Sequence, residues 1–163
     1  MTRKFTLSCS INGVQVRHEI DPRLLLPEFV REVAGLSGTR MGCLTGDCGA
    51  CTLRIDGKVI KSCLVPAVAA EGREIVTIEG AFDLDVIQQA FVSEYGFQCG
   101  FCTNGMVFAA GELLRENPHA NDADIRRAIS GNLCRCTGYD SIVAAVRTAR
   151  DNLGSQSLAN SPP

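Results

Sequence analysis

The sequence predicts an α+β fold in which the strands come first and the helices follow. Residues 4–20 and 51–63 alternate between apolar and polar side chains on either side of an Asn-Gly or Asp-Gly pair, which is the pattern of a β-hairpin. In the second half, apolar residues recur every three to four positions, as on one face of a helix. The change of period near Gly80 predicts two domains, at residues 1–80 and 81–153.

The first half is expected to contain two hairpins, one helix and a late strand. The first hairpin joins residues 4–11 to 14–20, and a helical pattern follows over residues 25–33. Residues 51–63 form the second hairpin, and residues 74–80 supply a further short strand. Two hairpins with a crossing helix and a late strand indicate a β-grasp, ferredoxin-like sheet.

The second half is expected to be a small four-helix bundle. Apolar stripes predict helices over residues 84–95, 104–116 and 142–153. A shorter helix is expected over residues 121–129, whose start has an Asn-x-x-Asp capping pattern. Short links between four helices favour a bundle. Residues 154–163 are rich in Ser and Pro and predict a flexible tail.

Charge and hydropathy exclude several classes of function. The 163 residues include 16 Lys and Arg against 18 Asp and Glu, a net charge of −2. With no basic excess, neither nucleic acid nor an anionic membrane surface is an expected partner. No apolar run approaches the roughly 20 residues of a membrane span, and the first residues lack the pattern of a signal peptide. A cytoplasmic protein is the expectation.

Nine cysteines are many for a chain of this length. In a reducing compartment they indicate metal or redox chemistry rather than disulfides. Cys9 stands alone on the apolar face of its predicted strand, where a small core residue is expected. The other eight form two sets. The first set is Cys43, Cys48, Cys51 and Cys63, and the second set is Cys99, Cys102, Cys134 and Cys136.

The first set has the spacing C-x4-C-x2-C followed by a fourth cysteine after eleven residues. This is the spacing of plant-type [2Fe–2S] ligation. Gly42, Gly46 and Gly49 lie among these cysteines, where a tightly folded backbone can direct N–H groups at the sulfurs of an anionic cluster. Zinc is the alternative, but zinc sites usually combine two close pairs of cysteines.

The second set has the spacings C-x2-C and C-x-C, each in a link between predicted helices. Helix N-termini present free N–H groups and positive dipole ends, which suit a cluster of negative charge. If the helices pair, both links meet at one end of the bundle and bring four thiolates together. By spacing alone, zinc remains an open alternative at this site.

Both sets together resemble one family closely. The stretches "MGCLTGDCGACTLRIDGKVIKSC", "QCGFCTNGM" and "GNLCRCTGY" occur in the order found in the small iron–sulfur subunits of the molybdenum hydroxylases, the xanthine dehydrogenase and aldehyde oxidase family. The resemblance covers about residues 4–152. It implies a β-grasp ferredoxin domain that binds one [2Fe–2S] cluster through the first set, and a four-helix bundle that binds another through the second.

The resemblance also implies partners and a direction of electron flow. It implies a large molybdopterin-binding subunit and a medium FAD-binding subunit, assembled as a dimer of heterotrimers. Gln98 and Cys136 match family positions that touch the pterin. Single electrons would pass from the molybdopterin centre through the second-set cluster and the first-set cluster to FAD or another acceptor. No substrate site is expected in this chain, so neither the substrate nor the final acceptor can be derived from it.

One residue departs from the family pattern, and one other class of function stays open. The family motif reads "CTPG", whereas this chain has "CTNG", with Asn104 in place of the proline. A small change in local rigidity is expected, because the cysteines themselves are unchanged. The alternative function is a freestanding ferredoxin-like carrier or a zinc-binding module. Gln98 and the predicted helical half argue against it, since a simple ferredoxin needs only the first half.

Overall fold

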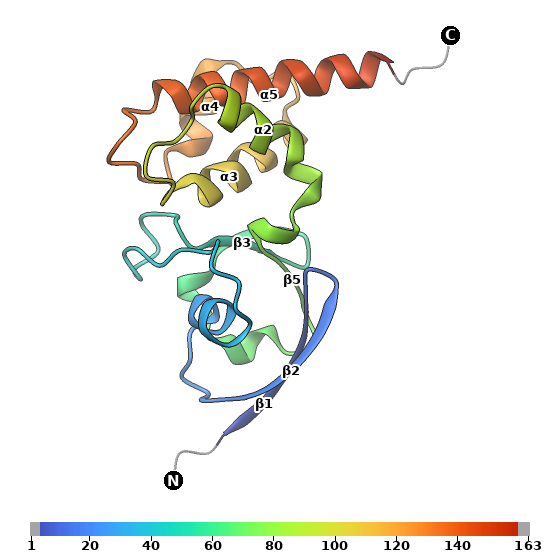
Figure 1. Cartoon of the computed structure of the whole chain (residues 1–163), viewed down its shortest axis with the longest axis vertical. Helices are drawn as coiled ribbons and strands as arrows, with labels where there is room; N and C mark the ends of the chain where they lie inside the picture. The colour runs from blue at the N-terminus through green and yellow to red at the C-terminus, as the bar shows by residue number, and fades with distance from the viewer. Residues whose placement is uncertain (1–3, 160–163) are drawn as a thin grey trace.

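The computed structural model describes residues 4–159, in which five strands form one sheet (Figure 1). The strand order is β2-β1-β5-β3-β4. β1 and β5 run parallel, and the other neighbours are antiparallel. The strands are β1 Phe5–Ile11, β2 Val14–Ile20, β3 Thr52–Ile55, β4 Lys58–Lys61 and β5 Glu74–Val76.

The two predicted hairpins are confirmed. β1 pairs with β2 in a register that ends at Ile11 opposite Val14, and β3 pairs with β4 up to Ile55 opposite Lys58. Both central residues of each two-residue turn have positive φ: 52° and 80° in the first turn, 49° and 77° in the second. Such turns match the right-handed twist of the flanking strands, which explains the Asn-Gly and Asp-Gly pairs.

The helix predicted over residues 25–33 is present but is mostly not an α-helix. Only α1, Leu26–Glu28, has α geometry, and the chain continues as a π-helix over Phe29–Val33. Phe29 is fully buried in one apolar cluster with strand residues such as Leu7 and Leu53. Four short 3₁₀ turns follow β4 and form the link to α2: Ser62–Leu64, Ala67–Ala70, Ile78–Gly80 and Phe82–Leu84. The strand predicted over residues 74–80 therefore ends early, at Val76.

Four helices form the second half. They are α2 Asp85–Ser93, α3 Thr103–Glu116, α4 Asp122–Ile129 and α5 Asp140–Ala159. Their apolar faces share a second buried cluster, which includes Phe91, Met106 and Ile125. α3 lies against β3, so the helices sit on the sheet at that strand (Figure 1). None of the helices in residues 4–159 is long and apolar enough to cross a membrane.

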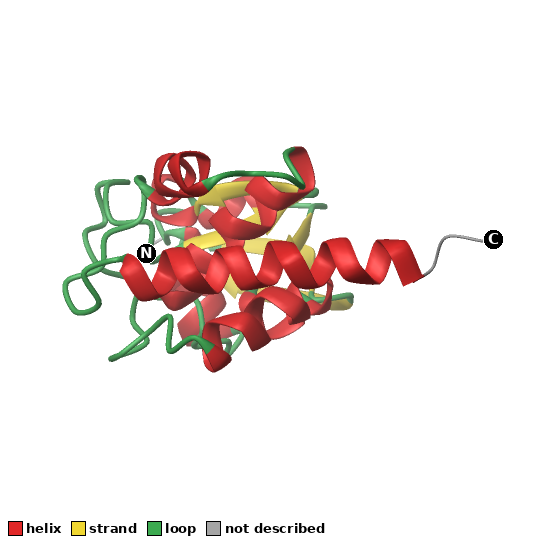
Figure 2. Cartoon of the chain, turned by 90° about the horizontal axis from the view of Figure 1, so that it is seen from above, coloured by secondary structure: helices red, strands yellow, loops and turns green. Residues whose placement is uncertain are grey.

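α5 is longer than predicted and projects past the rest of the molecule (Figure 2). Residues 154–159, expected in a flexible tail, are helical, whereas residues 160–163 lie outside the described part of the chain. Gly154 lies within the helix, and a single glycine costs a helix only about 1 kcal/mol. α5 itself contains no proline, and the next proline along the chain is Pro162.

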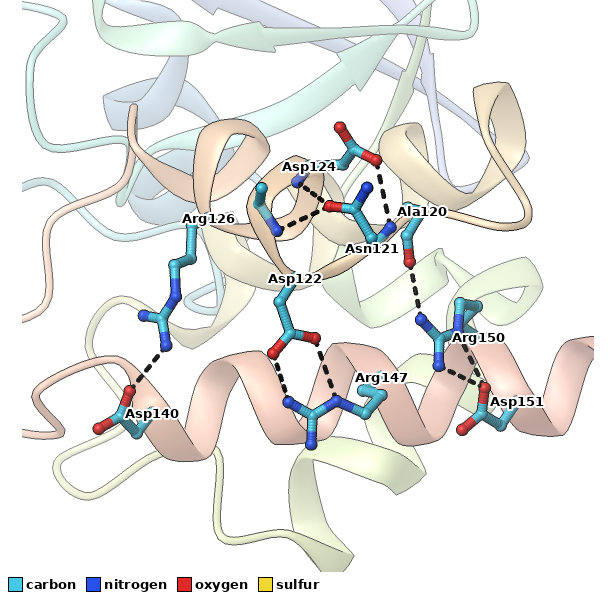
Figure 3. A network of polar contacts seen from close by, with 10 residues as sticks. Ala120, Asn121, Asp122, Asp124, Arg126, Asp140, Arg147, Arg150 and Asp151 are labelled. Carbon is cyan, nitrogen blue, oxygen red and sulfur yellow. Dashed lines mark hydrogen bonds and ion pairs between the residues drawn. The ribbon is translucent and has the colours of Figure 1, made fainter.

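Polar contacts fix α4 against α5 (Figure 3). Asn121 begins α4 with a capping box: its side chain accepts the N–H groups of Ala123 and Asp124, and Asp124 accepts the N–H of Asn121 at 3.1 Å. The Asp122 carboxylate receives two hydrogen bonds from Arg147, at 2.6 and 3.1 Å, which lower its pKa. Arg126 of α4 pairs with Asp140, the first residue of α5, so this ion pair also joins the two helices that flank the link with Cys134 and Cys136.

Candidate metal centres

The first set of cysteines lies in an irregular loop that ends at β3. Leu44, Gly46 and Gly49 have φ of 58°, 84° and 70°, so the loop reverses direction repeatedly between its cysteines. These reversals direct backbone N–H groups inward. The sulfur of Cys43 accepts the N–H of Thr45 at 3.4 Å and that of Cys48 at 3.3 Å.

The fourth cysteine of the first set reaches this loop from the far end of the second hairpin. Cys63 lies just beyond β4, and its N–H donates to the sulfur of Cys51 at 3.4 Å. Gly42 is needed where it stands, because a Cβ there would lie 2.9 Å from the Cys48 sulfur. At this position the backbone lies too close to a sulfur for a side chain to fit.

The thiols of the first set differ in acidity. Hydrogen bonds from Thr45 and from the Cys48 backbone lower the pKa of Cys43 to about 5. Burial and the neighbouring Cys51 raise the pKa of Cys63 to about 11, although the backbone N–H of Gly46 opposes the rise. Several thiolates this close repel one another, so four of them ionise together only with positive charge between them, which ferric ions supply.

The second set comes from two links, one between α2 and α3 and one between α4 and α5. Cys102 is the N-cap residue of α3. Burial, and then the neighbouring Cys134, raise the pKa of Cys102 to about 12. The sulfurs of Cys99 and Cys136 lie 3.6 Å apart, and both residues are exposed. The packing of the helices thus brings all four cysteines together at one end of this half.

Two residues that the sequence analysis did not single out surround Cys134. The Thr137 hydroxyl donates to the Cys134 sulfur at 3.1 Å, and the Cys134 N–H donates to the Tyr139 phenol oxygen at 2.9 Å. Burial tends to raise the pKa of Cys134, but the hydrogen bonds from Thr137 outweigh it and lower that pKa. The signal was available in the sequence as two hydroxyl residues within five positions of Cys134.

Six of the eight thiols in the two sets approach one another in pairs. Cys51 is close to Cys63, Cys99 to Cys136 and Cys102 to Cys134. Within residues 4–159, no three His, Cys, Asp or Glu side chains converge as the ligands of one metal ion would. Pairs of thiols suit a [2Fe–2S] cluster, in which two cysteines bind each iron. The donors and the shaped loops therefore fit such a cluster at each set.

The two cysteine sets meet at a tight contact. The N–H of Leu133, the residue before Cys134, donates to the Cys48 carbonyl at 2.9 Å. Asn132 is buried, and its side-chain amide donates to the Gly105 carbonyl at 2.8 Å. A Cβ on Gly105 would come within 2.2 Å of the Gly49 carbonyl oxygen, so only glycine allows this approach. The hydrogen bond from Leu133 to Cys48 thus joins the two sets directly, because Leu133 precedes Cys134 in the chain.

Asn104, which stands in place of the family proline, lies at the same contact. Its side-chain amide donates to the Thr52 carbonyl at 3.3 Å, and its side-chain oxygen is buried without a hydrogen-bond partner. The expected role of Asn104 was local rigidity alone. The structure adds a polar link from α3 to β3, which a proline could not make.

The two residues predicted to lie near the pterin are at the surface, in the two links of the second set. Gln98 is exposed, next to the exposed Cys99. Cys136 is also exposed, while Cys102 is buried. Gly46 and Gly49 both hold left-handed turns of the first-set loop, as their φ values require.

Comparison with known proteins gives consistent matches. Residues 77–147 match the model of a [2Fe-2S] binding domain family. The gamma subunit of caffeine dehydrogenase from Pseudomonas sp. strain CBB1 is 45% identical over 148 residues, which are 87% of this chain and 89% of the relative. The xanthine dehydrogenase iron-sulfur-binding subunit of Escherichia coli O157:H7 is 45% identical over 147 residues, which are 86% of this chain and 91% of the relative.

Solved structures agree with these relatives. Quinoline 2-oxidoreductase from Pseudomonas putida 86 contains a chain that superposes with a TM-score of 0.84 at 41% identity, covering 93% of this chain and 97% of that one. Aldehyde oxidoreductase from Desulfovibrio desulfuricans superposes with a TM-score of 0.84 at 36% identity. There the match covers 93% of this chain but 17% of the other, so a similar unit occurs within a longer polypeptide.

Proposed function

The chain belongs to the small iron–sulfur subunits of the molybdenum hydroxylases, the xanthine dehydrogenase and aldehyde oxidase family, and we propose that its two cysteine sets each hold one [2Fe–2S] cluster. It is an electron-transfer subunit of an oxidoreductase complex. The contact between the sets is the observation that carries the proposal of two clusters in series. Leu133 and Cys48 join their backbones there by a hydrogen bond of 2.9 Å.

Each residue near the sulfurs has a physical role in this proposal. When bound, a [2Fe–2S] cluster takes up and releases one electron at a time, becoming more negative on reduction. The N–H groups that point at Cys43 and Cys51 stabilise that additional charge, as does the Thr137 hydroxyl at Cys134. Burial of Cys51, Cys63 and Cys102 keeps water away from the inner sulfurs.

The finer description of the fold is part of the same proposal. We assign residues 1–80 to a β-grasp ferredoxin-like domain and residues 81–153 to a four-helix bundle. The separation of the buried apolar residues supports the division: one cluster contains residues up to Ile75, and the other begins at Ala81. Each half would then hold one [2Fe–2S] cluster beside its own apolar core.

The exposure of the cysteines supports a direction for electron entry. Cys99 and Cys136 are exposed beside Gln98, and this surface would receive the large molybdopterin-binding subunit. Exposed Leu44 and Leu64 lie in or beside the first-set loop, which would face the medium FAD-binding subunit. The relatives are named as subunits, which supports partners of this kind. The complex would be a dimer of heterotrimers in the cytoplasm, with its substrate selected in the large subunit.

Metal analysis of the native complex tests this proposal. The small subunit should contain about four irons and four sulfides, and reduction should produce two distinct EPR signals. Molybdopterin- and FAD-binding subunits should copurify with it. Zinc in place of iron, or a single cluster signal, would contradict the two-cluster assignment. A monomer that carries iron but has no partner subunits in its native extract would indicate a freestanding carrier.

A further inference from the structure

Three hydrogen bonds close a ring around Cys134. The Cys134 N–H donates to the Tyr139 phenol oxygen at 2.9 Å. The Tyr139 N–H donates to the Thr137 hydroxyl oxygen at 3.2 Å, and that hydroxyl donates to the Cys134 sulfur at 3.1 Å. The Thr137 N–H also points at this sulfur, at 3.5 Å. Backbone and sulfur of one cysteine are thus both tied to the residues that follow it.

The directions of these hydrogen bonds follow from the available protons. A cysteine that binds metal is a thiolate and has no proton to donate, so the Thr137 hydroxyl must be the donor to the sulfur. Its oxygen remains free to accept the Tyr139 N–H. The Tyr139 oxygen accepts the Cys134 N–H, and its own proton faces the Asn132 carbonyl at 3.5 Å. Each of these hydrogen bonds therefore has its own donor proton and its own acceptor atom.

The backbone of this turn is held in a costly conformation. Tyr139 has a φ of 73°, in the left-handed region that a bulky residue rarely adopts. Such a conformation is energetically unfavourable and persists only where surrounding contacts impose it. Here the Tyr139 carbonyl accepts the N–H of Val143 at 2.9 Å in the first turn of α5, while the phenol reaches back to Cys134. Tyr139 thereby ties the turn to the helix.

We propose that Thr137 and Tyr139 are positioning residues for the second-set cluster, with Thr137 setting its reduction potential and Tyr139 holding Thr137 and Cys134 in place. The inference rests on the proposed function, because it requires Cys134 to be a cluster ligand. A hydrogen bond to a ligand sulfur favours the more negative, reduced state and so raises the potential. In the first set, Thr45 lies near Cys43, but its hydroxyl donates to the Asp47 carboxylate at 2.5 Å.

The test is a redox titration of the holo-complex followed by EPR, with three variants and one control. Thr137→Val keeps the shape of the side chain but removes the donor, and Thr137→Ser restores it. Tyr139→Phe removes the oxygen that accepts the Cys134 N–H. Ser130→Ala is the matched control, because its hydroxyl donates to the Arg127 carbonyl at 2.7 Å and to no sulfur. Iron content is measured in parallel for each variant.

Thr137→Val should lower the midpoint potential of one cluster and leave the other unchanged, and Thr137→Ser should return it toward the original value. Tyr139→Phe should shift the same signal and change its g-values, while Ser130→Ala should change neither. Unchanged potentials in Thr137→Val would overturn the proposal. Should that variant lose iron, an unchanged signal in Tyr139→Phe would overturn it instead. A native complex without a second cluster would refute the proposed function itself, before any variant is compared.

Discussion

The first cysteine set is gathered almost entirely by one loop, whereas the second is assembled from two links between helices. Cys43, Cys48 and Cys51 lie within nine residues, and the adjoining hairpin delivers Cys63. Cys102 and Cys134 are brought together only because α3, α4 and α5 pack against one another. The comparison teaches that local backbone geometry forms the first site and that tertiary packing forms the second.

The hydrogen bonds at the two sites differ in the same way. At Cys43 and Cys51 the short contacts to sulfur come from backbone N–H groups. At Cys134 a side-chain hydroxyl contributes as well. A backbone donor survives most substitutions, whereas a side-chain donor is lost with a single one. Substitution of Thr137 alone should therefore change the potential of the second site, as the Thr137 variants test.

Removing one cysteine from each set, in separate variants, should have the largest effect and tests whether the two sites are independent. Cys51→Ser should abolish the first-set cluster and Cys102→Ser the second-set cluster, because each removes a buried thiol. Each variant should retain about two of about four irons and lose one EPR signal. Cys9→Ala is the control, since Cys9 belongs to the sheet core and not to either set, and it should keep both signals. Loss of both signals from Cys51→Ser alone would show that the sites are not independent.

Gly105→Ala should disturb the contact that joins the two sites. The new Cβ would lie 2.2 Å from the Gly49 carbonyl oxygen, which is backbone and cannot turn away. We expect a loss of about 1–3 kcal/mol in the free energy of unfolding, as for other overpacked positions. Thermal unfolding of the holo-complex measures this as a lower Tm.

Gly154→Ala is the matched control for Gly105→Ala. It is also a helix position, but a Cβ there meets no atom within 4 Å. It should leave the Tm unchanged or raise it, because alanine favours helix by about 1 kcal/mol over glycine. Equal Tm values for the two variants would show that the approach of α3 to the first-set loop is not tight.

Asn104→Pro, which restores the family residue, should have the smallest effect. It removes the hydrogen bond to the Thr52 carbonyl and also a buried oxygen that has no partner, and these two effects oppose each other. Proline is tolerated in the first turn of a helix, where its missing N–H has no intrahelical acceptor. The unfolding free energy should change by less than about 1 kcal/mol, with iron content unchanged. Loss of either EPR signal would mean that the link from α3 to β3 supports a cluster.

Local signals made most of the elements predictable. The Asn-Gly and Asp-Gly turns, the capping box at Asn121 and the apolar stripes of the helices all act within a few residues, and the structure contains each of them. The predictions were less accurate where contacts between residues far apart in the sequence determine the structure. The π-helix at Phe29–Val33 is part of the sheet core, and α5 continues past Gly154.

The sequence by itself determined the family, the two sets of four cysteines as candidate ligands, and a first half with the strands followed by a helical second half. These depend on spacing and periodicity along the chain, which local geometry translates directly into structure. Only the tertiary structure decided that Leu133 meets Cys48, that Gly105 meets Gly49, and that Thr137 and Tyr139 enclose Cys134. Contacts such as these depend on how separate elements pack and on left-handed backbone at single residues, and neither leaves a periodic pattern in the sequence.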